Sequence, residues 1–452
     1  MLVPLLAAWL VPLAAQTSTI QPAEEYYKVY TEHPRLFLRP QRLKLLRREK
    51  ERRSMRWLQF ETLMEGKAPM PEPGFAHALY YQVTDAEIHG REAVRWALGP
   101  GSDLRQLALV FDWCQPVLSA AQSKALAAKL QKGIQAAARS SDLGIIRART
   151  LAAVALADHA PDSGDLEWLV RTWWRGQMAA ALRAGRNAVT RDDAYPLFEF
   201  LHAVRDNLYI DLRDPVPGFF KTFPIFHLLS HYPAAYAAAE NDYRVPAIRE
   251  VAEPDLTRAA LSRAAELIMV AYDNNAPESQ VLQGWLMHDR FLLRGTLGIT
   301  YEFLWANPYQ PGLSYYHVPL IHHDELFGRL FVRSSWDDTA TWVGYFDGVL
   351  QRFADGWPTV LRPELEHAPI ELPDAVILFG AGLQRFTLEL TEPAEVFLVG
   401  LRPRQAYDIE IDDREIFEAT TDAGGILTLK LPEKVRLGVR MRPVARASNG
   451  VP

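Results

Sequence analysis

The chain has 452 residues, which is more than one hydrophobic core usually serves, so at least two domains are expected. Hydrophobic residues make up 49% of the chain and charged residues 23%, a composition that excludes a largely disordered protein. The net charge of −6 combines both signs, so the composition gives no electrostatic reason to expect a nucleic-acid partner.

Residues 1–15 are almost entirely apolar and end in Ala14-Ala15, the pattern of a signal-peptide core with a small-residue cleavage site. A basic segment in front of that core is missing. No later run of about 18 apolar residues appears, so no membrane-spanning helix is predicted. Cys114 is the only cysteine, which leaves no intrachain disulfide and no cysteine metal cluster. The pattern predicts a secreted or periplasmic protein with no membrane partner after signal removal.

Helical periodicity predominates over residues 16–310, which are predicted to form one helical domain. The clearest predicted helices span residues 103–113, 120–139, 145–159, 165–184, 195–208, 223–230, 254–272 and 284–304. Loops containing Gly and Pro, such as Gly99-Pro100-Gly101, separate them. An even run of helix hairpins over about 250 residues predicts an (α/α) toroid-like array.

After a connector at residues 311–325, the pattern changes to strands, and residues 326–452 are predicted to form an antiparallel β-sandwich domain. Short apolar or alternating runs recur at residues 326–334, 339–346, 375–379, 386–390, 396–399, 407–411, 426–431 and 437–441. Turn residues such as Asp412-Asp413 separate several of them. The predicted fold class is α+β multidomain, with an N-terminal (α/α) toroid-like helical domain followed by a C-terminal antiparallel β-sandwich.

The predicted helix that begins near Asp193 has one apolar face and one polar face. The polar stripe consists of Tyr195, Glu199, His202 and Asp206, at i, i+4, i+7 and i+11. A phenol, two carboxylates and an imidazole on one face suit proton transfer if that face lines a cleft. The structural alternative is a polar helix surface in contact with water or with neighbouring helices.

Tyr195 and His202 are the predicted catalytic residues of this stripe. Asp206, at i+4 from His202, suits the role of orienting the imidazole as a general base. Arg205 and Asn207 are predicted to bind a substrate carboxylate, Arg205 through its planar guanidinium group.

Other substrate-binding candidates occur in polar, aromatic segments that suit the rim of a cleft, although ordinary connectors have the same composition. They are Glu240, Asn241, Tyr243, Arg244, His288 and Arg290. His227 and His231 lie at i,i+4, a spacing that can bind a metal. No glutamate follows the first histidine as in zinc proteases, and no third ligand is evident. Neither a metal nor another cofactor is therefore predicted.

Three segments resemble the heparinase II/III-like branch of the polysaccharide lyases. They are His33-Pro34-Arg35-Leu36-Phe37-Leu38 followed by a basic helix, residues 107–130 with Phe111-Asp112-Trp113 at the centre, and residues 330–342 with Arg333-Ser334-Ser335-Trp336. The order of the helical and strand-rich parts is also similar, so the resemblance covers most of the chain. It implies a toroid followed by a sandwich, with an acidic, uronate-containing polysaccharide or oligosaccharide bound in the cleft between them and cleaved by β-elimination.

β-Elimination requires neutralisation of the substrate carboxylate and a Tyr or His within reach of the C5 proton. The family pattern includes an Asn-His pair and a His-rich strand, whereas this chain has no Asn-His dipeptide and no histidine cluster after Trp342. Tyr195 is the residue in a family-like position. Three functions stay open: a lyase, a non-catalytic glycan-binding or scaffold protein on the lyase fold, and a glycoside hydrolase using carboxylates such as Asp193, Glu199 or Asp206.

Overall fold

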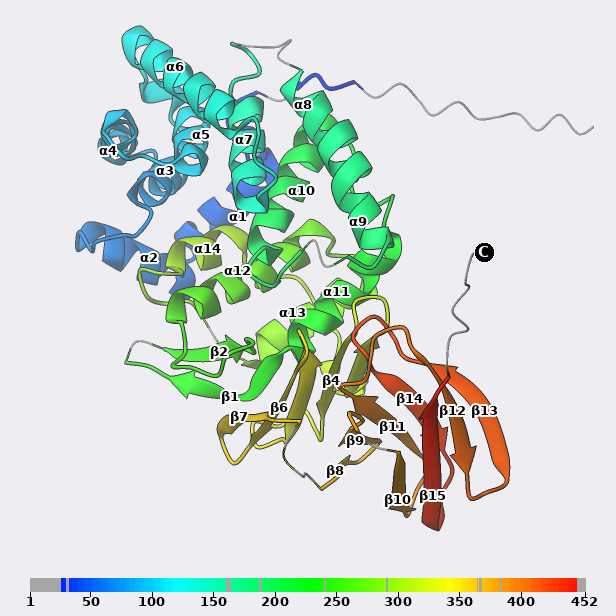
Figure 1. The fold of residues 1–452 in the computed structure, drawn as a ribbon. Coiled ribbons are helices and arrows are strands. Elements are labelled where there is room, and N and C mark those ends of the chain that lie inside the picture. Colours follow the sequence, from blue (N-terminus) through cyan, green and yellow to red (C-terminus); the bar gives the residue numbers. More distant parts are fainter. Residues whose placement is uncertain are drawn as a thin grey trace, which may run out of the picture.

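The computed structural model describes residues 26–29, 32–159, 164–186, 189–239, 241–289, 292–363, 365, 368–382 and 384–444. The predicted signal peptide, Glu240 and Arg290 lie outside the described residues. Within them, helices come first in the chain and strands follow (Figure 1). The predicted α+β order of a helical part and a strand-rich part is confirmed.

The helical part begins with a run of short and medium-length helices, whose starts often carry a side-chain cap. Ser54, Asp103, Ser119, Asp142 and Asp255 each accept a hydrogen bond from a backbone N–H of the first turn. The helices are α1 (Pro40–Glu51), α2 (Met55–Glu65), α3 (Pro73–Thr84), α4 (Glu87–Leu98), α5 (Leu104–Trp113), α6 (Ala120–Ala137), α7 (Leu143–Ala155), α8 (Asp165–Glu167), a π-helical segment (Trp168–Met178), α9 (Ala179–Arg183), α10 (Ala194–Leu208), α11 (Pro217–Leu229), α12 (Leu256–Tyr272), α13 (Pro277–Asp289) and α14 (Ile299–Trp305).

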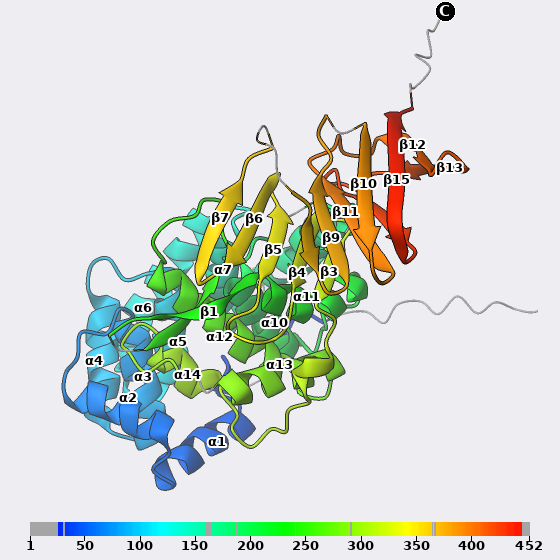
Figure 2. The ribbon, with the colours of Figure 1, turned by 90° about the horizontal axis from the view of Figure 1, so that it is seen from below.

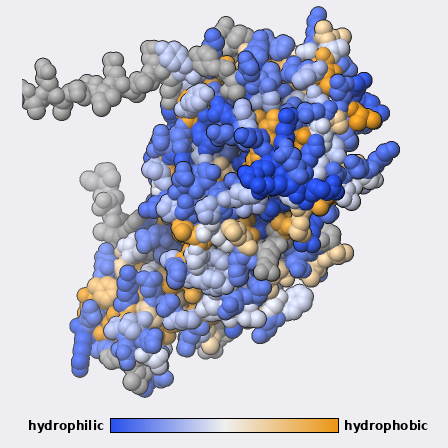
Figure 3. All heavy atoms as spheres, turned by 180° about the vertical axis from the view of Figure 1, so that it is seen from behind, coloured by the Kyte–Doolittle hydropathy of each residue, from blue (hydrophilic) through white to orange (hydrophobic). Residues whose placement is uncertain are grey.

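Six helices pack one against the next in a closed order. Contacts run from α3 to α5, α7, α10, α12 and α14, and α14 packs on α3 again. Large side chains, among them Trp113, Trp174 and Trp305, fill the core that these helices share. Among the described residues, every helix is too short or too polar to cross a bilayer. The surface opposite the view of Figure 1 is mostly hydrophilic, with small apolar patches over both parts (Figure 3).

Two strands that the sequence did not predict form a hairpin inside the helical part, β1 (His231–Ala237) and β2 (Asp242–Pro246). The remaining strands are β3 (Ile321–Asp324), β4 (Arg329–Arg333), β5 (Trp342–Phe346), β6 (Val349–Ala354), β7 (Trp357–Leu361), β8 (Ile370–Leu372), β9 (Ala375–Phe379), β10 (Arg385–Leu390), β11 (Ala394–Val399), β12 (Ala406–Ile411), β13 (Glu415–Thr420), β14 (Leu427–Leu431) and β15 (Lys434–Pro443). β3 lies in the segment predicted as the connector.

These later strands form three sheets, whereas a sandwich has two. The first sheet has the order β3-β4-β5-β6-β7, the second β14-β11-β9-β8 and the third β10-β15-β12-β13 (Figure 2). Ile377 of the second sheet packs towards the first, and its neighbour Val376 packs towards the third. β9 and β11, the inner strands of the second sheet, are nearly continuously apolar because both faces of the sheet are covered there, and they pair in parallel.

The first sheet also packs directly on the helical part. Phe331, Trp342 and Phe353 belong to the helical core, whereas Val332 and Val343 face the second sheet. The indole N–H of Trp342 donates to a backbone carbonyl at the end of α11 at 2.7 Å. The helical part and the first sheet therefore share one core, and the surface between them is fixed rather than hinged on a linker.

Candidate functional site

Tyr195 lies in the interior of the ring of helices and is 2% exposed. Its hydroxyl donates to Oε1 of Glu199 at 2.7 Å and accepts from the indole N–H of Trp305 at 3.0 Å. Arg105 donates to both oxygens of the same carboxylate, at 2.6 and 2.8 Å, and Arg147 pairs with Oε2. We call Arg105, Arg147, Tyr195 and Glu199 the ring cluster. The expectation that this helical face lines a cleft is wrong, because neighbouring inner helices cover it.

The electrostatics of the ring cluster oppose a role in proton transfer. Burial alone would raise the pKa of Glu199, but the guanidinium groups of Arg105 and Arg147 outweigh burial and lower it to about 2. Burial and the Glu199 carboxylate raise the pKa of Tyr195 well above its ordinary value of 10. A phenol that stays protonated, and that no solvent reaches, is not a base near neutral pH. The ring cluster instead ties α5, α7 and α10 together.

The other predicted residues of α10 also bind neighbouring structure. His202 is 3% exposed, and its Nε2 donates to the carbonyl oxygen of Ile268 at 3.3 Å. Arg205 lies 4.0 Å over the ring of Tyr272 and donates to the backbone carbonyl of the same residue. Asn207 is fully buried, and its amide donates to Ala203 at 2.9 Å. The cleft that these roles require does not exist at α10 within the described structure.

The predicted rim residues do not converge on one site. Asn241 donates to a backbone carbonyl at residue 292, and Tyr243 is 1% exposed in a small apolar core beside α12. Arg244 pairs with Asp338 at 2.9 Å and lies over Trp285. His288 is exposed beside Tyr315, which also contacts Trp285. Arg244 and His288 therefore flank the same aromatic cluster, whereas Asn241 and Tyr243 do not reach it.

Two of the segments that resemble the lyase family contact each other. The carboxylate of Asp112 accepts from the backbone N–H groups of Arg35 and Leu36 at 2.9 and 2.8 Å. The indole of Trp113 donates to the carbonyl oxygen of Leu36 at 2.9 Å. These residues anchor the chain before α1 to α5, so their role in this structure is to hold the fold.

A pocket of about 340 Å³ lies between the helical part and the first sheet. We call it the interdomain pocket. Its charged lining consists of Arg191, Arg249, Arg258, Arg329, Asp192 and Asp347, and its aromatic lining of Phe226, Phe327, Phe331 and Phe346. The lining thus includes four arginines and two aspartates. The arginines come from the chain before α10, the chain after β2, α12 and β4, which are far apart in the sequence.

The pocket arginines differ in how far they are paired. Arg258 contacts Asp192 at 2.9 Å. Arg329 contacts Asp324 at 3.2 Å and lies 3.6 Å over the ring of Phe226. Arg249 is exposed and pairs with no carboxylate among the described residues. The pocket therefore presents positive charge on an apolar background, a combination that favours an anionic ligand.

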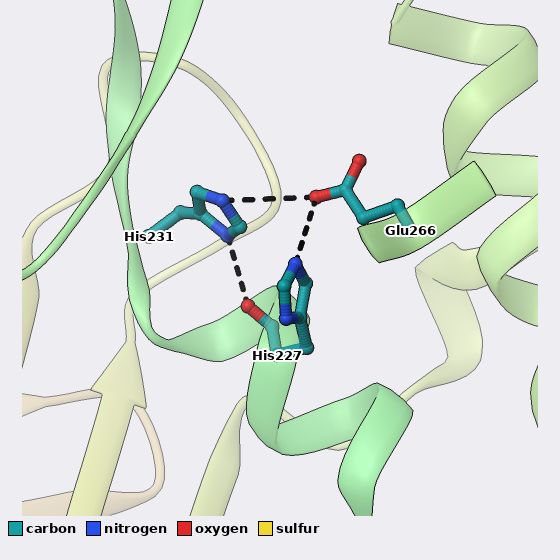
Figure 4. Close-up of side chains that lie close together, drawn as sticks. All are labelled: His227, His231 and Glu266. Carbon is teal, nitrogen blue, oxygen red and sulfur yellow. Dashed lines mark hydrogen bonds and ion pairs between the residues drawn. The ribbon is translucent and has the colours of Figure 1, made fainter. Parts of the chain in front are cut away.

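Three side chains that can ligate a metal converge near Arg191, which contacts His231 and the backbone of His227. Figure 4 shows the three side chains. His227 ends α11, His231 begins β1, and Glu266 lies in the middle of α12. Oε1 of Glu266 is 3.4 Å from Nε2 of His227 and 3.6 Å from Nε2 of His231. All three side chains are at most 2% exposed. We call them the histidine cluster, and two imidazoles with one carboxylate form a set that can hold a metal.

The surroundings keep both imidazoles neutral. Burial, followed by the charge of Arg191, lowers the pKa of His227 below its ordinary value of 6.5. The same two causes lower the pKa of His231 well below that value. The i,i+4 spacing identified the two histidines from the sequence, but nothing in the sequence connected them to Glu266, which lies on a different helix.

Comparisons with known proteins identify no family for this chain. No protein-family model matches it, and no curated protein matches it. One solved structure, named as a glycoside hydrolase, superposes with a TM-score of 0.30 and 9% sequence identity, covering 82% of this chain and 71% of that chain. A similarity at this level carries no argument about function. The resemblance to heparinase II/III-like lyases therefore stays a prediction from sequence motifs.

Proposed function

We propose that the protein binds an acidic, uronate-containing oligosaccharide or polysaccharide in the interdomain pocket and does not cleave it. The observation that carries this proposal is the excess of arginines in the lining of the pocket, which includes four arginines and two aspartates. Planar guanidinium groups bind carboxylates through paired hydrogen bonds. Phe327 and Phe346 add apolar surface against which the C–H faces of sugar rings pack.

The dimensions of the pocket agree with this class of ligand. Binding sites for small ligands have volumes of roughly 300–1,000 Å³ and combine apolar walls with a few placed polar groups. The interdomain pocket has a volume of about 340 Å³, which suits a short stretch of a glycan rather than a long chain. Arg249, at the exposed side, is the guanidinium group best placed to meet a carboxylate that enters from solvent.

Binding without cleavage is favoured over the lyase and hydrolase alternatives. β-Elimination needs a Tyr or His beside the bound uronate, and neither residue type lines the interdomain pocket as described. Tyr195 and His202 are buried elsewhere. Hydrolysis needs two facing carboxyl groups with room for substrate, whereas Glu199 is enclosed by Arg105 and Arg147.

The proposal extends to architecture and location. We infer that the closed order of α3, α5, α7, α10, α12 and α14 is an (α/α) toroid-like ring, with the interdomain pocket where this ring meets the first sheet. We also infer export to a periplasm or medium, on the strength of the apolar pattern at residues 1–15. Mass spectrometry of the exported protein tests the second point, with a new N-terminus after residue 15 as the expected result.

Calorimetric titration with uronate oligosaccharides of defined length tests the proposed binding. Wild-type protein is expected to bind them and not to bind a neutral glucan of equal length. Arg249→Ala and Arg258→Ala should each weaken binding roughly tenfold, because a hydrogen-bonded charged contact contributes about 1.5–3 kcal/mol. Arg95→Ala is the matched control, since its side chain is 76% exposed on α4 and does not line the pocket.

Two results would contradict the proposal. Equal binding of the neutral glucan would remove the role assigned to the arginines. Formation of unsaturated uronate products, followed by their ultraviolet absorbance, would show that the protein cleaves its ligand and would return the lyase alternative to first place.

A further inference from the structure

The histidine cluster holds His231 in a single tautomer. Nδ1–H of His231 donates to the backbone carbonyl oxygen of His227 at 2.9 Å. A neutral imidazole carries one N–H, so Nε2 of His231 presents a lone pair. That lone pair is 3.6 Å from Oε1 of Glu266, which is also an acceptor. Two acceptors facing each other in a buried site repel unless a proton or a cation lies between them.

The neighbouring donors do not resolve this conflict. The hydroxyl of Ser262 lies 3.2 Å from Nε2 of His231 and 3.3 Å from Nε2 of His227, and its single proton serves only one of them. Nη2 of Arg191 is 2.7 Å from both ring nitrogens of His231. A donor that is equidistant from the two nitrogens lies over the ring, because in the ring plane it would collide with the carbon between them. It therefore does not point along the in-plane lone pair.

The proton of His227 does not remove the conflict at His231. Nδ1 of His227 has no hydrogen-bond partner among the described residues, whereas its Nε2 lies 3.4 Å from Oε1 of Glu266 and 3.3 Å from the hydroxyl of Ser262. A proton on this Nε2 would donate to Oε1 but would leave the lone pair of His231 without a donor. With the proton on Nδ1, Nε2 adds a third acceptor to those of His231 and Glu266. Both rings are at most 2% exposed and lie beside the guanidinium group of Arg191, surroundings that favour neutral imidazole, the form that binds metals.

The two distances from Glu266 to the histidines match the spacing of ligand atoms in tetrahedral zinc coordination, and all three ligand atoms lie within 4.8 Å of one another. Zinc lies about 2.0–2.1 Å from imidazole nitrogen and about 2.0–2.2 Å from carboxylate oxygen, so neighbouring ligand atoms of a tetrahedron are about 3.4 Å apart. Oε1 of Glu266 is 3.4 and 3.6 Å from the two Nε2 atoms. Arg263 donates to the other carboxylate oxygen, Oε2, at 2.8 Å, which orients Oε1 towards the histidines.

The geometry points to a zinc-type divalent ion bound by Nε2 of His227, Nε2 of His231 and Oε1 of Glu266, with the hydroxyl of Ser262 or a water molecule as fourth ligand. Two imidazoles favour zinc over magnesium and calcium, which take oxygen ligands. The ion joins the end of α11, the start of β1 and the middle of α12. Ser262 also lines a small surface pocket, which gives the ion a route from solvent.

Arg191 sets the affinity of this site. Its positive charge beside His231 opposes that of the ion, so the affinity is lower than three protein ligands alone would give. Arg191→Gln removes the charge and keeps a hydrogen-bonding side chain of moderate length. This substitution is expected to tighten zinc binding at least about tenfold.

Metal titration of the whole chain tests the inference. The protein is stripped with a chelator, dialysed and titrated with zinc chloride, and bound metal is measured after gel filtration. One zinc per chain is expected, with no uptake of magnesium or calcium. Cobalt(II) should give the visible absorption of a tetrahedral site. Glu266→Gln and His231→Gln should each weaken zinc binding roughly hundredfold.

The matched control is His77→Gln, since His77 and His89 form another histidine pair, with Nδ1 atoms 2.9 Å apart, that belongs to no group of three ligands among the described residues. Its zinc stoichiometry should equal that of the wild type. Absence of zinc uptake by wild-type protein overturns the inference, and this measurement depends on no variant. Undiminished uptake by Glu266→Gln overturns it as well, as does unchanged or weaker binding by Arg191→Gln. None of these experiments contains a saccharide, so their outcome is independent of the proposed function.

Discussion

Two buried polar clusters of the helical part differ in the balance between donors and acceptors. In the ring cluster, the Glu199 carboxylate meets two guanidinium groups and a phenol, so each oxygen has a donor. In the histidine cluster, one oxygen of Glu266 meets two neutral imidazoles and no cation. Buried polar groups with enough partners stabilise a fold, whereas an excess of acceptors marks a place for a ligand.

The largest expected effect is a fall in the free energy of unfolding when the central carboxylate of the ring cluster is removed. Glu199→Gln leaves the guanidinium groups of Arg105 and Arg147 without their shared carboxylate in a buried site. The free energy of unfolding should fall by about 3–5 kcal/mol, because an uncompensated buried charge remains. Urea denaturation followed by circular dichroism measures it.

The control for that substitution is an ion pair on the surface. Glu92→Gln removes the partner of Arg95, whose side chain is 76% exposed, and should change the free energy of unfolding by about 0–1 kcal/mol. Similar losses from both substitutions would show that the ring cluster is not the structural centre described here.

The second-largest expected effect is stabilisation of the folded chain by zinc, and this stabilisation should depend on the histidine cluster only. Free zinc at about 100 times its dissociation constant should raise the free energy of unfolding by about 2.7 kcal/mol, because the ion binds the folded chain alone. The increase should shrink to about 0.4 kcal/mol in Glu266→Gln, whose zinc affinity is roughly hundredfold lower, and should persist in Tyr195→Phe. Thermal unfolding with and without zinc measures it, and an equal increase in all three proteins would assign the ion to another place.

Tyr195→Phe should have a smaller effect, confined to stability. The substitution removes a donor to Glu199 and the acceptor of the Trp305 N–H, so the free energy of unfolding should fall by about 1–3 kcal/mol. Uronate binding, followed by calorimetry, should not change. Weaker binding by this variant would place Tyr195 back among the candidate site residues.

The smallest expected effect is that the histidine cluster and the ring cluster change the free energy of unfolding over different pH ranges. The histidines titrate near 6.5 when unfolded and at lower pH when folded. Below pH 6.5 the unfolded chain therefore binds protons that the folded chain does not, and stability falls by at most about 1.4 kcal/mol per pH unit and proton. The pKa of Glu199 falls from 4.5 to about 2 on folding, so its contribution is lost only between these pH values.

The substitution His231→Gln distinguishes the contribution of the histidine cluster, below pH 6.5, from that of Glu199, below pH 4.5. In urea denaturation at a series of pH values, this variant should lose part of the pH dependence just below 6.5 and keep that below 4.5. An unchanged profile below pH 6.5 would mean that the imidazole of His231 is already protonated in the folded chain.

The sequence predicted the positions of the helices better than it predicted which residues pack against them. The helices predicted over residues 120–139 and 254–272 begin within two residues of α6 and α12 as found. The 3.6-residue period also gave the correct stripe of Tyr195, Glu199 and His202 on one face of α10. Periodicity does not say what covers a face. A helix of an inner ring is enclosed on most sides, so a polar stripe there meets buried charges of other helices instead of solvent.

The candidate site depends on pairings over long separations in the chain. Arg191, Arg249, Arg258 and Arg329 come from four segments, and no local pattern distinguishes them from surface arginines. Glu266 lies in α12 among alanines, leucines and the arginines Arg258 and Arg263, and no local spacing relates it to the histidines. Only the packing of α11, β1 and α12 brings it to the histidines, so spacing rules alone could not find it.

The three stacked sheets constrain how this part of the chain assembles. Strands alternate between layers, since β9, β11 and β14 belong to the second sheet and β10, β12 and β15 to the third. β15, the last described strand, inserts between β10 and β12 and pairs with both. Without β15, the third sheet would consist of β10 alone and the separate pair β12-β13. A truncation before Lys434 would therefore remove an interior strand of the third sheet and expose the apolar side of the second sheet beneath it.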